Sequence, residues 1–231
     1  MATTTSTARA LQSVPELQNG DHLSRDEFER RYHAMPAHKK AELIEGVVHM
    51  PSPVRFEEHS KPHFDLIGCL FHYKISTPGV LAGDNATVRL DLDNEPQPDV
   101  LLFVSPDRGG QAQVGEDGYV ESAPEFVAEV AASSASYDLH TKRTVYRRNR
   151  VREYLVWRVL DKKIDWFVLR GSQYENLSPD ADSIIRSEHL PGLWLDIAAV
   201  LAGDFPRVLS VIQQGLASPE HAAFVARMRE R

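Results

Sequence analysis

The sequence of 231 residues has very little cysteine and no long apolar run. Its single cysteine, Cys69, excludes an internal disulfide and a cysteine-based metal site, and it is typical of a protein in a reducing cytoplasm. Because Cys69 lies in the apolar stretch FDLIGCLFHY, we expect a buried structural thiol. No stretch approaches the roughly 20 apolar residues that a membrane-spanning helix needs. The sequence therefore predicts a cytoplasmic protein without a membrane partner.

The N-terminus lacks the basic segment and apolar core that mark a secretory signal. Its first residues, MATTTSTARALQS, are rich in Thr and Ser and predict a flexible tail over residues 1–21. The remaining length suits one domain, which we place at residues 22–205. Residues 206–231 are then expected to form a helical C-terminal tail, with a terminal helix that begins at Ser218.

Basic side chains are outnumbered, since 26 Lys and Arg face 33 Asp and Glu and give a formal net charge of −7. This balance argues against a general nucleic-acid coat protein. The distribution is uneven, however, because residues 142–163 contain nine bases and two acids, a net charge of +7. The stretch is either a solvated helix face or a surface suited to a polyanion near one defined site.

The N-terminal half alternates helical and strand patterns. Ser24 is a predicted N-cap, and the following residues, RDEFERRY, are predicted to be helical. Gly46 separates two short predicted strands in AELIEGVVHM. Apolar residues at helical spacing, Phe64, Ile67 and Phe71, then predict a longer helix.

The second half completes a pattern of strands and helices. DVLLFV and EFVAEVA are continuous apolar runs, typical of strands buried on both faces. A helix is predicted over SASYDLHTKRTVYRRNR, and VREYLVWRV and IDWFVLRG form a predicted hairpin. This mixed order indicates an α/β or α+β domain with a central mixed β-sheet flanked by helices.

Two acids lie at or inside the buried strands. Asp99 follows Pro98 and precedes the apolar run, so it is either a turn residue or a ligand. Glu129 lies inside FVAEVA, on the strand face that Val127 and Ala131 share. An unpaired ionised carboxylate there costs on the order of several kcal/mol or more. Glu129 must therefore meet a metal ion, water in a cleft or a base, the last of which includes a structural salt bridge.

Lys142 follows Glu129 by thirteen residues and lies in the first turns of the predicted helix. A helix lysine is usually exposed, but this side chain can return over the end of the Glu129 strand. Two carboxylates that converge at strand ends suit Mg²⁺, which takes oxygen ligands. A nearby lysine can orient or deprotonate a water molecule, or offset the charge of a reacting phosphate. The basic helix would then face a phosphate backbone.

These motifs, in this order, resemble the Uma2 family (DUF820) of restriction-endonuclease-like proteins, a branch of the PD-(D/E)XK nuclease superfamily. The resemblance covers most of residues 42–201 and runs through ELIEGVVHM, SPVRFEEHS, QPDVLLFV, PEFVAEVAASSASYDLHTKRTVYRRNRVREYLVW and HLPGLWLDI. It implies a restriction-endonuclease-like core and an endonuclease that hydrolyses DNA phosphodiester bonds. The implied cofactor is Mg²⁺, with Mn²⁺ as a substitute. The oligomeric state stays open, with a homodimer as one alternative, since many nucleases dimerise to cut both strands.

The resemblance also implies roles for single residues. Asp99, Glu129 and the backbone carbonyl of Val130 would bind the metal ion. Lys142 would be the catalytic lysine, moved from the usual strand position onto the helix, because Ala131 occupies that strand position. The set of two metal-binding acids and one catalytic lysine is therefore complete only if Lys142, on the helix, takes the place of the strand lysine.

Further residues match the family near these. Glu45 matches the acid of the N-terminal ELI(D/E)G pattern and is a catalytic candidate, with a hairpin-turn acid as the alternative. His59 matches a histidine of the first core helix and is an accessory candidate, although a lone helix histidine is more often structural. We expect the DNA backbone to contact three arginines that follow the lysine, namely Arg143, Arg147 and Arg148.

The sequence departs from the family pattern at two places. AASSAS replaces the Ser-Pro that follows the Glu-Val pair, and Leu155 replaces the tryptophan of GV-x-EYW. The net acidity and the lack of a recognisable specificity domain leave a second function open, a catalytically silent nucleic-acid-binding or protein-interaction module on the same fold. In a third interpretation, Glu129 and Lys142 form only a buried structural ion pair.

Overall fold

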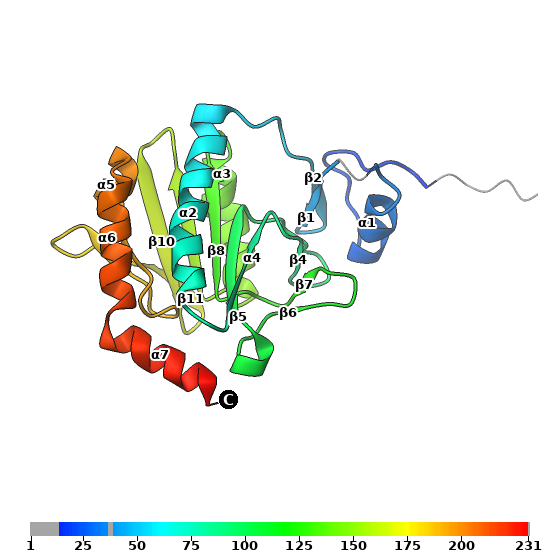
Figure 1. Ribbon diagram of the computed structural model, residues 1–231. Helices are drawn as coiled ribbons and strands as arrows, with labels where there is room; N and C mark the ends of the chain where they lie inside the picture. Colours follow the sequence, from blue (N-terminus) through cyan, green and yellow to red (C-terminus); the bar gives the residue numbers. More distant parts are fainter. Residues whose placement is uncertain (1–13, 37–38, 231) are drawn as a thin grey trace, which may run out of the picture.

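The computed structural model describes residues 14–36 and 39–230, so the first thirteen residues of the expected N-terminal tail lie outside the described part. The main sheet has the strand order β11-β10-β9-β8-β5-β3 (Figure 1). Strands β8 and β9 pair in parallel, and the other neighbours are antiparallel. The strands are β3 (Val80–Asp84), β5 (Val100–Val104), β8 (Phe126–Ala131), β9 (Glu153–Arg158), β10 (Lys163–Arg170) and β11 (Gln173–Asn176). The predicted central mixed sheet is confirmed.

Helices pack on both faces of this sheet. Helix α2 (Lys61–Ile75) crosses one face, with α5 (Ile197–Ala202) and α6 (Phe205–Leu216) packed in the same core (Figure 1). Helix α4 (Arg143–Arg148) packs on the opposite face through Tyr146. The result is a sheet covered by helices on both sides, as the order of elements predicted.

Strand β8 shows why its sequence is almost continuously apolar. Phe126, Ala128 and Val130 lie in the core beneath α2, while Val127 and Ala131 lie in the core beneath α4. Side chains alternate between the two faces of a strand, so a strand covered on both sides needs apolar residues at consecutive positions. The same alternation places Glu129 on the face of α4.

The N-terminal part forms a smaller layer beside the sheet (Figure 1). Helix α1 (Arg25–Tyr32) begins at the predicted N-cap Ser24, and β1 (Glu42–Ile44) and β2 (Val47–His49) form the predicted hairpin. Leu17 is buried against this layer, and the Gly20 N–H donates to the β2 carbonyl of Val48 at 2.8 Å. The last residues of the expected tail are therefore packed against the domain.

The helices expected at residues 206–231 are α6 and α7 (Pro219–Arg229), and Ser218 is the N-cap of α7 as predicted. Val208 and Ile212 of α6 and Met228 of α7 are buried in the core that contains α2. The described part of this segment is thus packed on the sheet domain. No helix within residues 14–36 and 39–230 has the length and apolar character needed to cross a membrane.

Shorter elements connect these layers. The 3₁₀ turn η2 (Pro106–Arg108) follows β5, and small sheets are formed by β4 (Val88–Arg89), β6 (Gln113–Val114) and β7 (Val120–Glu121), and by β12 (Ile184–Arg186) and β13 (Trp194–Asp196).

Two of the helical segments contain π-helical turns. The turn η1 (Phe56–Ser60) runs directly into α2, and α3 (Ala135–Tyr137) continues through η3 (Asp138–Lys142) into α4. A π-helical turn widens the helix locally, and such turns occur frequently at functional sites. His59 lies in η1 and Lys142 lies in η3. Cys69 is buried in α2, as predicted.

Candidate functional site

A cleft of about 1020 Å³ is lined by residues of the β1–β2 hairpin, η1, β8 and η3. Its wall includes Asp99, Glu129, Val130 and Lys142, which the sequence analysis had grouped as metal ligands and lysine. His59 lines the same cleft. These residues come from separate segments of the chain, so the fold itself brings the predicted constellation together.

Lys142 is the buried cation of the cleft. Its Nζ donates to Glu129 Oε1 at 2.9 Å and to Glu42 Oε1 at 3.0 Å. Burial acts to lower the pKa of Lys142, but the charges of Glu129, Glu42 and Asp138 outweigh it and hold this pKa well above its usual value. The Lys142 side chain therefore stays protonated. Two of the acids around it, Glu42 and Asp138, are site residues that sequence reasoning missed.

Glu129 is paired with a base, one of the three kinds of partner that its burial allowed. Its Oε1 accepts from Lys142 and also from the Tyr146 hydroxyl, the latter at 2.9 Å. Burial raises the pKa of Glu129 above its usual value, and the Lys142 charge opposes this rise. Among the described residues, no hydrogen bond uses Glu129 Oε2. That oxygen is therefore available to a ligand in the cleft.

Asp99 lies directly before β5 and is tied to the neighbouring strand β8. Its Oδ2 accepts from the Val130 N–H at 2.6 Å, and its Oδ1 lies 3.4 Å from His59 Nε2. The other ring nitrogen of His59, Nδ1, lies 2.9 Å from the Val130 carbonyl oxygen. Burial acts to raise the pKa of Asp99, but His59 and the Val130 N–H together hold this pKa below its usual value. Asp99 is therefore ionised, and His59 bridges it to Val130.

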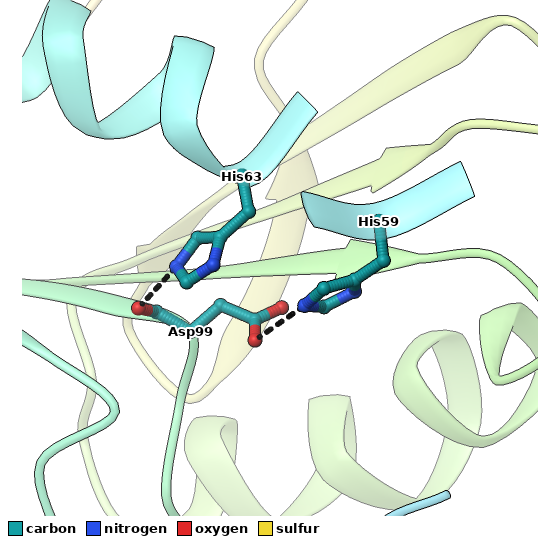
Figure 2. A group of neighbouring side chains, drawn as sticks. All are labelled: His59, His63 and Asp99. Atoms are coloured by element: carbon teal, nitrogen blue, oxygen red, sulfur yellow. Dashed lines mark hydrogen bonds and ion pairs between the residues drawn. The ribbon is translucent and has the colours of Figure 1, made fainter. Parts of the chain in front are cut away.

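His63 is a second histidine at Asp99 that sequence reasoning missed (Figure 2). Its Nε2 lies 2.9 Å from the Asp99 backbone carbonyl oxygen and 3.1 Å from Asp84 Oδ1. His59 and His63 are four residues apart, a spacing that places both on one side of a helix. This spacing is visible in the sequence EHSKPH and was the available signal.

Glu45 does not line the cleft, and the structure places it in the hairpin turn, the position that the sequence analysis gave as the alternative to a catalytic role. It occupies the hairpin turn with a positive φ of 54°, and its side chain is 43% exposed and pairs with Arg148 at 2.8 Å. Glu42, three residues earlier, lines the cleft and contacts Lys142. The turn directs Glu45 outward, whereas Glu42 lies on β1 beside the site.

The three arginines predicted to contact DNA do not line the cleft. Arg143 packs 4.9 Å from the centroid of an aromatic ring in β10, and Arg147 donates to a backbone carbonyl after β10 at 2.7 Å. Arg148 forms the ion pair with the hairpin-turn acid described above. Among the described residues, the exposed or half-buried bases that line the cleft include Lys40 and Arg55.

The donor set of the cleft fits a hard divalent cation. Asp99 and Glu129 offer carboxylate oxygens and Val130 offers a backbone carbonyl, the ligand types that Mg²⁺ prefers. Within the described residues Asp99 has no lysine or arginine partner, and the base in its ion pair is His59. A cation at this position would therefore meet one acid that still lacks a strong counter-charge.

A mixed sheet with helices on both faces, and two carboxylates and a lysine in one cleft, is the architecture that the sequence analysis expected of a restriction-endonuclease-like core. The chain belongs to the Uma2 family, since the model of that family, described as "Putative restriction endonuclease", matches residues 25–198. The family resemblance seen in the sequence is thereby confirmed.

The fold is also found in a solved structure. The chain is similar to "a putative nuclease belonging to DUF820" from Anabaena variabilis, with 15% sequence identity and a TM-score of 0.59. The match covers 78% of this chain and 98% of that one. At this identity the likeness shows the shared fold and does not assign an activity. The chain matches no curated protein.

Proposed function

We propose that this protein is a metal-dependent endonuclease that hydrolyses DNA phosphodiester bonds in the cleft. The observation that supports this most is the meeting of Asp99, Glu129 and Lys142 in one cleft, although they come from separate segments. Membership of a family described as "Putative restriction endonuclease" adds support.

Asp99, Glu129 and the Val130 carbonyl would hold the ion, which we propose to be Mg²⁺ with Mn²⁺ as a substitute. When bound, such an ion polarises the phosphoryl oxygen and lowers the pKa of a water molecule. The protein contributes orientation, because the Val130 N–H fixes Oδ2 of Asp99 at 2.6 Å. Lys142 in turn fixes Oε1 of Glu129 at 2.9 Å, which leaves the second oxygen for the cation.

Lys142 would stabilise negative charge that develops on the phosphate in the transition state. Burial acts to lower its pKa, but the charges of Glu129, Glu42 and Asp138 hold this pKa well above the usual value. In this network it is therefore a fixed positive charge and hydrogen-bond donor, and not a base. Such a pre-positioned charge in a partly dry site acts without reorganisation during the reaction.

A cleavage assay on supercoiled plasmid with Mg²⁺ or Mn²⁺ tests this function. We expect the wild-type protein to nick or linearise the plasmid, and chelation of the metal to stop it. Asp99→Asn, Glu129→Gln and Lys142→Met should each lower the rate by about 100-fold or more. Glu45→Gln is the matched control, since its carboxylate lies outside the cleft, and it should cleave at the wild-type rate. Cleavage that all three cleft variants retain would overturn the proposal.

A second candidate is a catalytically silent binding module on the same fold. The observation that favours it is the position of His59, whose two ring nitrogens face Asp99 Oδ1 and the Val130 carbonyl, two of the atoms that a metal ion would need. Calorimetric titration with Mg²⁺ and Mn²⁺ separates the two candidates. Binding that depends on Glu129 supports the nuclease, and a wild-type protein that binds neither ion supports the silent module.

A further inference from the structure

His59 and His63 present two imidazole rings to one carboxylate, and the proposed phosphodiester chemistry gives His63 no role. The rings lie side by side over the Asp99 side chain, with centroids 5.4 Å apart (Figure 2). One ligating atom from each of His59, His63 and Asp99 lies within 4.8 Å of the other two. Both histidines are half-buried and Asp99 is buried, so the group is sheltered from bulk water.

One nitrogen of each ring faces a backbone carbonyl oxygen, which only accepts hydrogen bonds. His59 Nδ1 faces the Val130 carbonyl oxygen and keeps its proton, whereas Nε2 faces Asp99 Oδ1 and is the nitrogen whose proton a metal ion would displace. His63 Nε2 faces the Asp99 carbonyl oxygen and the Asp84 carboxylate, so its lone pair lies on Nδ1. A carbonyl or carboxylate that holds the far nitrogen is the usual support of a metal-binding histidine.

The spacing between His59 and Asp99 also fits a metal ion. His59 Nε2 lies 3.4 Å from Asp99 Oδ1, which is longer than an ordinary hydrogen bond of about 2.7–3.2 Å. Two ligands of a tetrahedral ion with bonds of about 2.0–2.1 Å lie about 3.4 Å apart. Once Nε2 has given up its proton, this nitrogen and the anionic oxygen are spaced as two ligands of one cation.

We propose that His59, His63 and Asp99 form a binding site for a borderline transition-metal ion of the Zn²⁺, Co²⁺ or Ni²⁺ class. Imidazole nitrogen favours these ions, whereas Mg²⁺ favours oxygen. The site shares Asp99 with the proposed Mg²⁺ site but does not use Glu129. Asp84 is a positioning residue, because it faces the far nitrogen of His63 at 3.1 Å.

Calorimetric titration with Co²⁺ and Mg²⁺, together with the visible absorption of bound Co²⁺, tests the site. We expect His63→Gln to weaken Co²⁺ binding at least about tenfold while Mg²⁺ binding is unchanged. His72→Gln is the matched control, since it lies nine residues further along the same helical segment and therefore on its opposite side. This variant should bind Co²⁺ as tightly as the wild type.

Two further measurements separate this site from the proposed nuclease centre. Glu129→Gln should remove Mg²⁺-dependent plasmid cleavage and leave Co²⁺ affinity within about twofold of the wild type, since Glu129 is not a ligand here. X-ray absorption of the Zn²⁺-loaded wild-type protein should show imidazole in the first coordination shell. Because this measurement uses the wild-type protein, it does not depend on whether a variant folds. An oxygen-only shell, absence of Co²⁺ binding, or Co²⁺ affinity unchanged by both His59→Gln and His63→Gln overturns the proposal.

Discussion

At the scale of single residues, the cleft depends on one buried lysine. Lys142 lies between the carboxylates of Glu129 and Glu42, and its Nζ donates a hydrogen bond to each of them. Lys142 is only 5% exposed. Removing one partner of a buried ion pair leaves uncompensated charge, which is more costly than the net value of the pair. The stability and the proposed chemistry of this site therefore rest on the same side chain.

We predict that Lys142→Met lowers the free energy of unfolding by about 3–5 kcal/mol at neutral pH. Urea denaturation measures this change. Arg148→Met is the control, because its ion pair with Glu45 is solvent-exposed and such pairs contribute about 0–1 kcal/mol. The double variant Lys142→Met with Glu129→Gln should recover part of the loss. Equal effects of the two single variants would contradict a buried charge network.

Glu95 is a buried acid away from the cleft, and it sets a pH dependence. Within the described residues neither of its carboxylate oxygens has a hydrogen-bond donor. Burial, and then the neighbouring Glu29, raise the pKa of Glu95 from 4.5 to about 8. Between these two pH values the folded protein keeps a proton on Glu95 that the unfolded chain has released. The contribution of Glu95 to the free energy of unfolding is therefore fully present below pH of about 4.5, and it is lost as the pH rises through about 8.

We therefore predict that the wild-type protein loses stability between pH 5 and pH 9, by on the order of a few kcal/mol from this residue. Glu95→Gln imitates the protonated acid and should flatten this pH dependence. Urea unfolding at pH 5, 7 and 9 measures both proteins. A variant that is no more stable than the wild type at pH 9 would show that Glu95 is not the responsible group.

At the scale of elements, Glu153 joins strand β9 to the loop before β13. Its Oε1 accepts from Ser187 Oγ at 2.9 Å and from the backbone N–H groups of Glu188 and His189 at 2.8 Å each. Its Oε2 accepts from Trp166 Nε1 at 2.9 Å. Burial raises the pKa of Glu153 to about 7, against the lowering effect of these donors. One carboxylate thus satisfies four donors around the core.

We predict that Glu153→Leu lowers the free energy of unfolding by about 3 kcal/mol or more, because each buried donor left unpaired costs about 1–3 kcal/mol. Glu153→Gln should lose less, since its amide oxygen can still accept from the loop. Thermal and urea unfolding of the two variants give the order. If Glu153→Leu is as stable as Glu153→Gln, the hydrogen bonds of Glu153 do not anchor the loop.

The sequence predicted the elements better than the faces they use. The helix through Phe64, Ile67 and Phe71 exists, but Phe64 is 75% exposed and Phe71 is 55% exposed, whereas Leu70 and Tyr73 are buried. Apolar residues lie on both sides of this helix, so periodicity alone does not select the buried side. Packing on the sheet makes that choice.

At the scale of the whole molecule, most of the basic side chains that line the cleft do not come from the basic segment 142–163 that is conspicuous in the sequence. The basic segment 142–163 contributes Lys142 to the cleft, but its arginines at 143, 147 and 148 contact other parts of the protein. Lys40 and Arg55 line the cleft instead. A phosphate backbone that enters the cleft would meet these two side chains.

We predict that Lys40→Ala and Arg55→Ala each weaken DNA binding and reduce its salt dependence by about one unit of slope. Arg148→Ala removes the same charge outside the cleft and should leave the slope unchanged. Fluorescence anisotropy with a labelled duplex at several salt concentrations, in the absence of cleavage-supporting metal, gives the slopes. If only the Arg148 variant loses affinity, DNA approaches along the helix and not through the cleft.

The sequence by itself determined the buried strands and the need of Glu129 for a partner, because a charge inside an apolar strand requires one whatever the fold. It also determined the family, through the order of its motifs. Only the tertiary structure identified Lys142 and Glu42 as partners in the cleft, and only it gave His63 a partner in Asp99. Those choices depend on turn geometry and on contacts between distant segments, which local sequence patterns do not encode.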